Sequence, residues 1–270
     1  MKTQTKFWLL ALLFSLALPL KAEPLINWQP WQALLHQAVQ VERGGQASRV
    51  DYGYLAGQKT AISQLLIEAA KLDKARFDQA SKQEQLAFLI NLYNLATVEL
   101  VLTAYPKLTS IKDLGSLLRS PWQQKRIQLW GASISLDDLE HGLIRNSDRY
   151  NDPRIHFAVN CASIGCPALR PEAYSAEQLE AQLEQQARLF LADRSRNRWD
   201  GKGLLLSSIF KWYGDDFAKG WRGAKSLSQF LALYGDALGL TPEQTSELSG
   251  ERVRLEFLPY DWGLNREAGP

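Results

Sequence analysis

The distribution of apolar and polar residues along the chain predicts a mainly helical protein. Apolar residues recur at helical spacing in several segments, and short apolar runs flank turn residues in others. The predicted helices cover residues 28–42, 60–72, 81–105, 176–191, 208–218, 226–238 and 242–248, with one more that Ser135 and Asp138 cap and that ends at Ile144. The predicted strands form two hairpins, residues 125–136 and 197–207, and two single strands, residues 154–159 and 253–258.

The longest predicted helix is also the most apolar. Ser81 and Glu84 have the spacing of a capping box at its start, and Pro106 ends it. Because residues 81–105 are apolar on nearly every face, we expect this helix to be buried on most sides. Glu84, Asn91 and Asn94 share one stripe of it. Buried amides need hydrogen-bond partners, so the stripe either ties loop backbone to the core or orients catalytic groups.

The mixture of elements indicates an α+β fold. Helices dominate, and the strands come mostly as hairpins rather than as repeated strand–helix units. We therefore predict a predominantly helical single domain with a small, largely antiparallel β-sheet, over residues 23–270. The chain has no Gly-rich phosphate-binding loop of either standard pattern.

The first 22 residues resemble a secretory signal peptide. Lys2 and Lys6 precede an apolar run, residues 7–18, and the small Ala22 offers a cleavage point before Glu23. An uncleaved anchor is the alternative, but the run is shorter than the about 20 residues of a membrane span. We expect a periplasmic or secreted protein without a transmembrane segment in the mature chain.

The charge of the mature chain gives no reason to expect nucleic-acid binding. The formal net charge is +2 for the whole chain and falls to −1 without residues 1–22, which carry three lysines and no acidic residue. A near-neutral chain does not attract a polyanion over a distance. The expected ligand is a small molecule or a peptide-like substrate, and the oligomeric state stays open.

The two cysteines, Cys161 and Cys166, lie in a loop of small and polar residues after the predicted strand 154–159. The sequence leaves four interpretations of Cys161 open: a disulfide to Cys166, a reactive thiol, an inert buried thiol, or a metal ligand. Alternation along a strand places Cys161 on the face opposite His156, which makes His141 the better candidate base. The spacing fits no standard zinc pattern, and we expect no metal or cofactor.

A third segment, residues 207–217, is rich in aromatic residues and ends in two acids. A purely structural role, as an aromatic core followed by a charged turn, is enough to explain this composition. The alternative is that this segment forms a binding surface, in which Trp212, Tyr213 and Ser207 contact the ligand.

Together these segments resemble the family known as domain of unknown function 547. The matching stretches are residues 50–52, 87–94, 136–145, 156–171, 207–217 and 260–262. Leu89 stands where the family often has Trp. The resemblance implies a domain found in bacterial envelope proteins and, joined to other modules, in plants. Its plant members keep counterparts of Cys161 and His141 but lack those of Cys166 and His156, which favours Cys161 with His141 as the shared pair.

These observations combine into one functional hypothesis and two alternatives. The hypothesis is a thiol-dependent hydrolase or acyl transferase, with Cys161 as nucleophile and His141 as base. Glu84, Asn91 or Glu140 would orient the imidazole, and the N–H groups of Ala162 and Ser163 would bind an oxyanion. The predicted binding residues are His156, Ser163, Ser207, Trp212 and Tyr213. The alternatives are a non-catalytic binding module of the envelope and a thiol–disulfide role, although four residues separate the cysteines rather than two.

Overall fold

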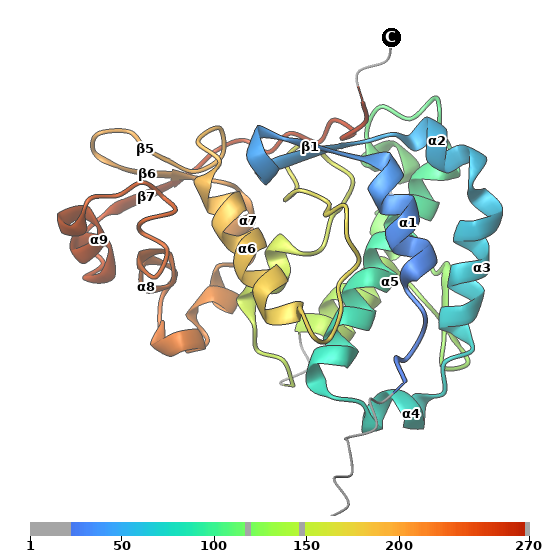
Figure 1. The fold of residues 1–270 in the computed structure, drawn as a ribbon. Coiled ribbons are helices and arrows are strands. Elements are labelled where there is room, and N and C mark those ends of the chain that lie inside the picture. The colour runs from blue at the N-terminus through green and yellow to red at the C-terminus, as the bar shows by residue number, and fades with distance from the viewer. Residues whose placement is uncertain (1–22, 117–119, 146–148, 268–270) are drawn as a thin grey trace, which may run out of the picture.

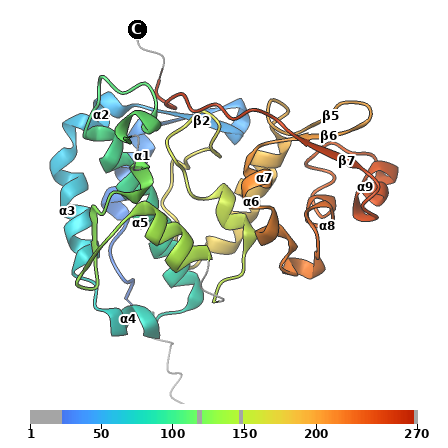
Figure 2. The same ribbon diagram turned by 180° about the vertical axis from the view of Figure 1, so that it is seen from behind.

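The computed structural model describes residues 23–116, 120–145 and 149–267. The predicted signal peptide, residues 1–22, lies outside the described residues. Figures 1 and 2 show helices α1 to α5 gathered at one end of the molecule and the elements from α6 onward at the other. The first five helices are α1 (Gln29–Ala38), α2 (Tyr52–Gly57), α3 (Lys59–Ala70), α4 (Lys74–Gln79) and α5 (Lys82–Leu102).

Helix α5 is the centre of the larger hydrophobic core. Ser81 caps it by accepting the Glu84 N–H at 3.1 Å, as the sequence predicts. Among the described residues it is the one helix long and apolar enough to cross a membrane, but 94% of its apolar window is buried inside the fold. That burial is what a core helix requires, and it confirms the predicted burial of this segment.

Among the described residues, four α-helices follow α5 along the chain. The α-helices are α6 (Leu179–Ala192), α7 (Ile209–Trp212), α8 (Leu227–Ala232) and α9 (Pro242–Ser249). A π-helical segment spans Asp138–Arg145, and Ser135 caps it as predicted by exchanging hydrogen bonds with Asp138. Single 3₁₀ turns cover Arg43–Gly45, Ile111–Leu114, Pro121–Gln123, Pro153–Phe157, Gly214–Ala218 and Trp221–Gly223.

The strands form small sheets of two or three members. Two antiparallel hairpins pair β1 (Val39–Glu42) with β2 (Ala47–Val50) and β3 (Ile127–Leu129) with β4 (Ala132–Ile134). In the third sheet β6 (Gly203–Leu206) pairs antiparallel with β5 (Arg198–Trp199) and parallel with β7 (Arg254–Phe257). The described residues therefore form a mainly helical α+β fold with small, largely antiparallel sheets, and the predicted fold class is confirmed.

Several predicted elements differ from the structure: the helices predicted over residues 208–218 and 226–238 are shorter, as α7 and α8, and two further elements need correction. Residues 154–159 form a 3₁₀ turn, Pro153–Phe157, rather than a strand, because the Asp152 carboxylate accepts the Arg154 N–H at 3.0 Å and turns the backbone at once. The helix predicted over residues 28–42 ends at Ala38. The β-branched Val39 and Val41 then extend as β1, and Gly44–Gly45 close its hairpin.

The 3₁₀ turn lies between two hydrophobic clusters. Ile155 and Val159 belong to the cluster around α5, whereas Phe157 belongs to the cluster formed by α6 to α9. Phe157 packs on the rings of Phe190 and Phe210, at centroid distances of 5.1 and 5.9 Å. Packing on both sides fixes this segment, and the loop that carries the cysteines follows it directly.

Candidate functional site

A cavity of about 380 Å³ opens beside the cysteine loop. Its walls come from distant parts of the chain: α5, the π-helical segment, the cysteine loop, α7 and the segment after β7. Six aromatic residues line it, namely Tyr93, Trp122, Trp212, Tyr213, Tyr260 and Trp262. The polar lining consists of Asp137, Glu140, His141, His156 and the two cysteines.

Cys161 and Cys166 form a disulfide bond across the loop, with their Cα atoms 6.1 Å apart. Of the four interpretations of Cys161, this geometry fits the disulfide. The two sulfurs are unequally placed, because Cys161 is half-buried whereas Cys166 is 4% exposed. The Tyr260 hydroxyl lies 3.2 Å from each sulfur. The bridge thus forms part of the cavity wall, with one phenol in contact with both of its atoms.

A network of asparagines holds the loop in place. The Asn160 side chain accepts the Ala162 N–H at 2.9 Å and donates to the Pro167 carbonyl at 2.8 Å. Asn94 on α5 accepts the Asn160 N–H at 2.8 Å and donates to the Ala158 carbonyl at 3.1 Å. Because these amides are buried, each bond is costly to lose. One member of the polar stripe on α5 therefore positions the backbone next to Cys161.

His141 lies between acidic and basic neighbours. Arg145 donates to its Nδ1 at 2.6 Å, so that nitrogen is an acceptor and the neutral ring carries its proton on Nε2. Nε2 is 3.9 Å from the Asp137 carboxylate. Among the described residues, neither imidazole hydrogen-bonds to the Cys161 sulfur. Cys161 and His141 therefore line the same cavity, but no hydrogen bond joins them.

His156 is the more deeply fixed imidazole. It donates from Nε2 to the Asp216 carboxylate at 2.8 Å and stacks on the Tyr213 ring at 4.1 Å. Burial lowers the pKa of His156, which favours the neutral ring. Against the opposing effect of burial, hydrogen bonds from His156, Arg145 and Lys219 hold the pKa of Asp216 well below its usual range. Since two cations already balance Asp216, a neutral His156 is consistent with an ionised carboxylate.

The tyrosines of the cavity keep their protons. Burial raises the pKa of Tyr213, and the nearby Glu140 carboxylate raises it further. The same two causes raise the pKa of Tyr93, and burial raises that of Tyr260. These hydroxyls are therefore hydrogen-bond donors at every physiological pH, and Tyr260 can donate to a sulfur that gains negative charge.

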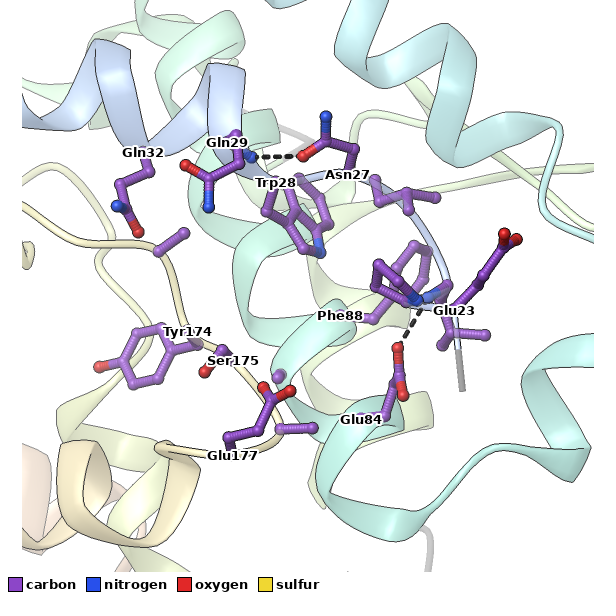
Figure 3. A pocket seen from close by; sticks show the side chains of 16 residues that line it. Glu23, Asn27, Trp28, Gln29, Gln32, Glu84, Phe88, Tyr174, Ser175 and Glu177 are labelled. Atoms are coloured by element: carbon purple, nitrogen blue, oxygen red, sulfur yellow. Dashed lines mark hydrogen bonds between the residues drawn. The ribbon is translucent and has the colours of Figure 1, made fainter. Parts of the chain in front are cut away.

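The structure brings some of the predicted site residues together and separates others. Cys161, His141, Glu140, His156, Trp212 and Tyr213 line the one cavity. Glu84 and Asn91 do not, which corrects their predicted role. Figure 3 shows Glu84 at the wall of a different cavity, where its carboxylate accepts the Leu25 N–H at 2.7 Å. Asn91 binds the backbone N–H and carbonyl of Tyr174, so it ties a loop to the core.

Two further predictions about the loop are also corrected. The Ala162 N–H is bound by Asn160 and cannot donate to an oxyanion. The Ser163 side chain is buried outside the cavity, 1% exposed. Ser207 is buried as well, and its hydroxyl accepts the Ile209 N–H, so it acts as a turn residue.

Several residues of the site had no local signal in the sequence. Tyr260 and Trp262 reach the cavity from the chain's end, and Trp122 from a 3₁₀ turn. Only the family resemblance, through residues 260–262, pointed to the first two. Among the described ranges, no group of three His, Cys, Asp or Glu residues is placed to hold a metal ion.

Comparison with known proteins gives one match. Residues 77–191 match the family described as "Protein of unknown function, DUF547". Comparisons with curated proteins and with solved structures find no match to the chain. The matched segment contains α5, the π-helical segment with His141, and the cysteine loop, so it supplies much of the cavity. The resemblance to the DUF547 family is therefore confirmed over residues 77–191, the segment that supplies much of this cavity.

Proposed function

We propose that the cavity carries out thiol–disulfide exchange, with Cys161 as the sulfur that is attacked. The observation that carries this proposal is the unequal placement of the bridged sulfurs at the cavity wall: Cys161 is half-buried and Cys166 is 4% exposed. Exchange requires one accessible sulfur and one leaving sulfur. The aromatic walls provide a surface on which a thiol-bearing substrate can lie.

The reaction balances with a dithiol substrate. One substrate thiolate attacks Cys161 Sγ, the bond to Cys166 breaks, and Cys166 Sγ leaves with the electron pair. The second substrate thiolate then attacks the substrate sulfur of the mixed disulfide and releases Cys161 as a thiolate. Two electrons pass to the protein, and the two protons lost by the substrate end on the cysteine thiols. A substrate disulfide runs the same steps in reverse, in the direction that the two reduction potentials set.

Tyr260 supports both steps of this exchange. Its hydroxyl is 3.2 Å from Cys161 Sγ and 3.2 Å from Cys166 Sγ. Because its pKa is raised by burial, it remains protonated and donates to whichever sulfur carries negative charge. A hydrogen bond to a thiolate lowers the thiol pKa and improves it as a leaving group.

A redox titration with thiol labelling tests the proposal. Mature protein is equilibrated with mixtures of reduced and oxidised dithiothreitol and followed by tryptophan fluorescence, since Trp212 lies 4.8 Å from the Tyr260 ring. We expect a reversible two-electron transition, about 30 mV per tenfold change in the equilibrium constant. With an aromatic disulfide reagent, Cys161 in Cys166→Ser should react at least about tenfold faster than Cys166 in Cys161→Ser. Equal rates, or a bridge reduced only after unfolding, would overturn the proposal.

The second candidate is the hydrolase or acyl transferase with a Cys–His pair. It is supported by the two imidazoles that line the cavity with Cys161, one of them fixed by Asp216. This chemistry requires the bridge to be reduced first, because a disulfide sulfur is not a nucleophile. Cys166→Ser incubated with p-nitrophenyl acetate should then release nitrophenol in a burst that His156→Gln or His141→Gln slows. A burst indifferent to both imidazoles would contradict the Cys–His pair.

A further inference from the structure

The charged residues that line the cavity are all acidic. Asp137 and Glu140 belong to its wall, whereas no Lys or Arg is among its described lining residues. Arg145 lies behind His141 and is already bound to Asp216 at 2.7 Å. His141 and His156 add no positive charge to the cavity lining when their imidazoles are neutral. The formal charges of the described lining residues are therefore negative, those of Asp137 and Glu140.

Asp137 is placed to receive a cation from the ligand. Its side chain is one-third exposed, at 33%, and the basic atom paired with it among the described residues is His141 Nε2, 3.9 Å away. Burial raises the pKa of Asp137, and Glu140 and Asp138 raise it further, against the lowering effects of His141 and of a hydrogen bond with Gln123. A partly desolvated carboxylate that no Lys or Arg of the described residues pairs with is stabilised by a cation that arrives with the ligand.

The aromatic wall favours the same kind of group. Trp262 contacts Trp122, Trp212 and Tyr260, with ring centroids 5.8, 5.6 and 4.5 Å apart. Trp212 is exposed over 45% of its surface and borders the cavity. Lys112 already places its ammonium 4.7 Å from the centre of the Trp262 ring. Indole faces attract cations and also bury apolar stems, so this wall can hold both parts of a basic side chain.

We propose that the cavity binds a cationic nitrogen carried on an apolar stem, such as the lysine side chain of a peptide, with Asp137 as its charge partner and Trp212 and Trp262 against the stem. The proposal rests on the proposed function in placing this group beside the Cys161–Cys166 bridge. The substrate of exchange is then a thiol or disulfide with a basic group next to the reacting sulfur.

Peptides that contain no sulfur test this inference separately from the thiol chemistry. Binding of acetyl-Ala-Lys-Phe-amide to the oxidised mature protein is measured by calorimetry and tryptophan fluorescence. The norleucine peptide is the neutral control, the glutamate peptide the acidic one, and butylammonium shows whether a free amine suffices. We expect the lysine peptide to bind at least about tenfold more tightly than the norleucine peptide. Asp137→Asn should remove this preference, whereas Asp236→Asn, an exposed acid paired with Arg188 elsewhere, should preserve it.

Each outcome decides between the possibilities. Equal affinity for the lysine and norleucine peptides, preference for the glutamate peptide, or no binding at all would overturn the cation site. Butylammonium binding as tightly as the peptide would retain the site and identify the ligand as a free amine. Because the probes cannot exchange sulfur, normal redox titration without lysine selectivity would contradict only this inference. Lysine selectivity without a redox transition would contradict only the exchange reaction.

Discussion

The side-chain oxygen of Asn94 accepts the backbone N–H of Asn160 at 2.8 Å and so joins helix α5 to the loop that carries Cys161. The bond is buried, since Asn94 is 3% and Asn160 4% exposed. Asn91, one turn earlier on α5, makes two equivalent bonds to the backbone of Tyr174 instead. The two amides offer a matched pair: both fix a loop, but only one fixes the cysteine loop.

Asn94→Leu should therefore affect both stability and redox behaviour. Leaving the Asn160 N–H without a partner should lower the free energy of unfolding by about 1–3 kcal/mol, measured by urea unfolding. A looser loop holds the two thiols together less well, so the bridge should become about tenfold easier to reduce with dithiothreitol. Asn91→Leu should cost similar stability but leave the redox midpoint unchanged. Equal redox shifts in the two variants would contradict a specific role for Asn94.

Tyr260→Phe should raise the pKa of the Cys161 thiol. The change removes a hydroxyl 3.2 Å from the sulfur and leaves the ring in place. A donor to a thiolate favours the charged form, so its loss should shift the midpoint of iodoacetamide labelling upward by about one pH unit, measured in the Cys166→Ser background. Tyr213→Phe is the control, because Tyr213 lines the same cavity and stacks on His156. An unchanged midpoint in Tyr260→Phe would exclude the hydrogen bond as a functional contact.

The parts of the fold that the sequence predicts well are those set by local signals. The apolar residues of α5, its Ser81 cap and the Trp130–Gly131 turn between β3 and β4 each determine an element within a few residues. The 3₁₀ turn Pro153–Phe157 is different. Its apolar residues alternate as in a strand, yet Arg154 and His156 are buried as well, with carboxylate partners at Glu180 and Asp216. Those partners lie far along the chain, so no local pattern reveals them.

The site divides in the same way. Cys161, His141 and Trp212 are recognisable because their residue types and neighbours point to chemistry. Tyr260 is not, since its importance comes from contact with sulfurs almost a hundred positions earlier. The predicted role of Glu84 is wrong because its partner is also distant in the sequence. Glu84 has the capping-box spacing, but its carboxylate binds the Leu25 N–H instead of turning back to Ser81.

We propose export to the periplasm with cleavage before Glu23, from the signal-like composition of residues 1–22. The residues that follow pack onto the fold: Leu25 donates to Glu84 at 2.7 Å, and Arg76 donates to the Pro24 carbonyl at 2.7 Å. N-terminal sequencing of protein from a bacterial envelope fraction should therefore begin at or near Glu23. An intact chain beginning at Met1 in the membrane pellet would contradict cleavage. An oxidising compartment would also maintain the Cys161–Cys166 bridge.

The buried His156 should make stability fall in mild acid. Burial lowers its pKa below the ordinary value of 6.5, and the contrary attraction of Asp216 and Glu140 does not restore it. In the unfolded chain the same imidazole titrates near its ordinary value. Between the folded and the unfolded pKa, the unfolded state therefore binds one more proton. The free energy of unfolding should then decrease as the pH falls below about 6.5, by at most about 1.4 kcal/mol per pH unit, until the folded ring is protonated too.

His156→Gln tests this assignment because its amide can still donate to Asp216 but does not titrate. Urea unfolding of the mature protein between about pH 5 and 7 should show a shallower pH dependence in His156→Gln than in the wild type, by up to one proton. His36→Gln is the matched control, since His36 is exposed on α1. The ionised Asp216 also contributes to the free energy of unfolding, but at lower pH. Because the pKa of this carboxylate is depressed, its contribution disappears only as the pH falls below the ordinary value of 3.8. Identical slopes in the wild type and His156→Gln would show that His156 is not the group whose neutral form the fold requires.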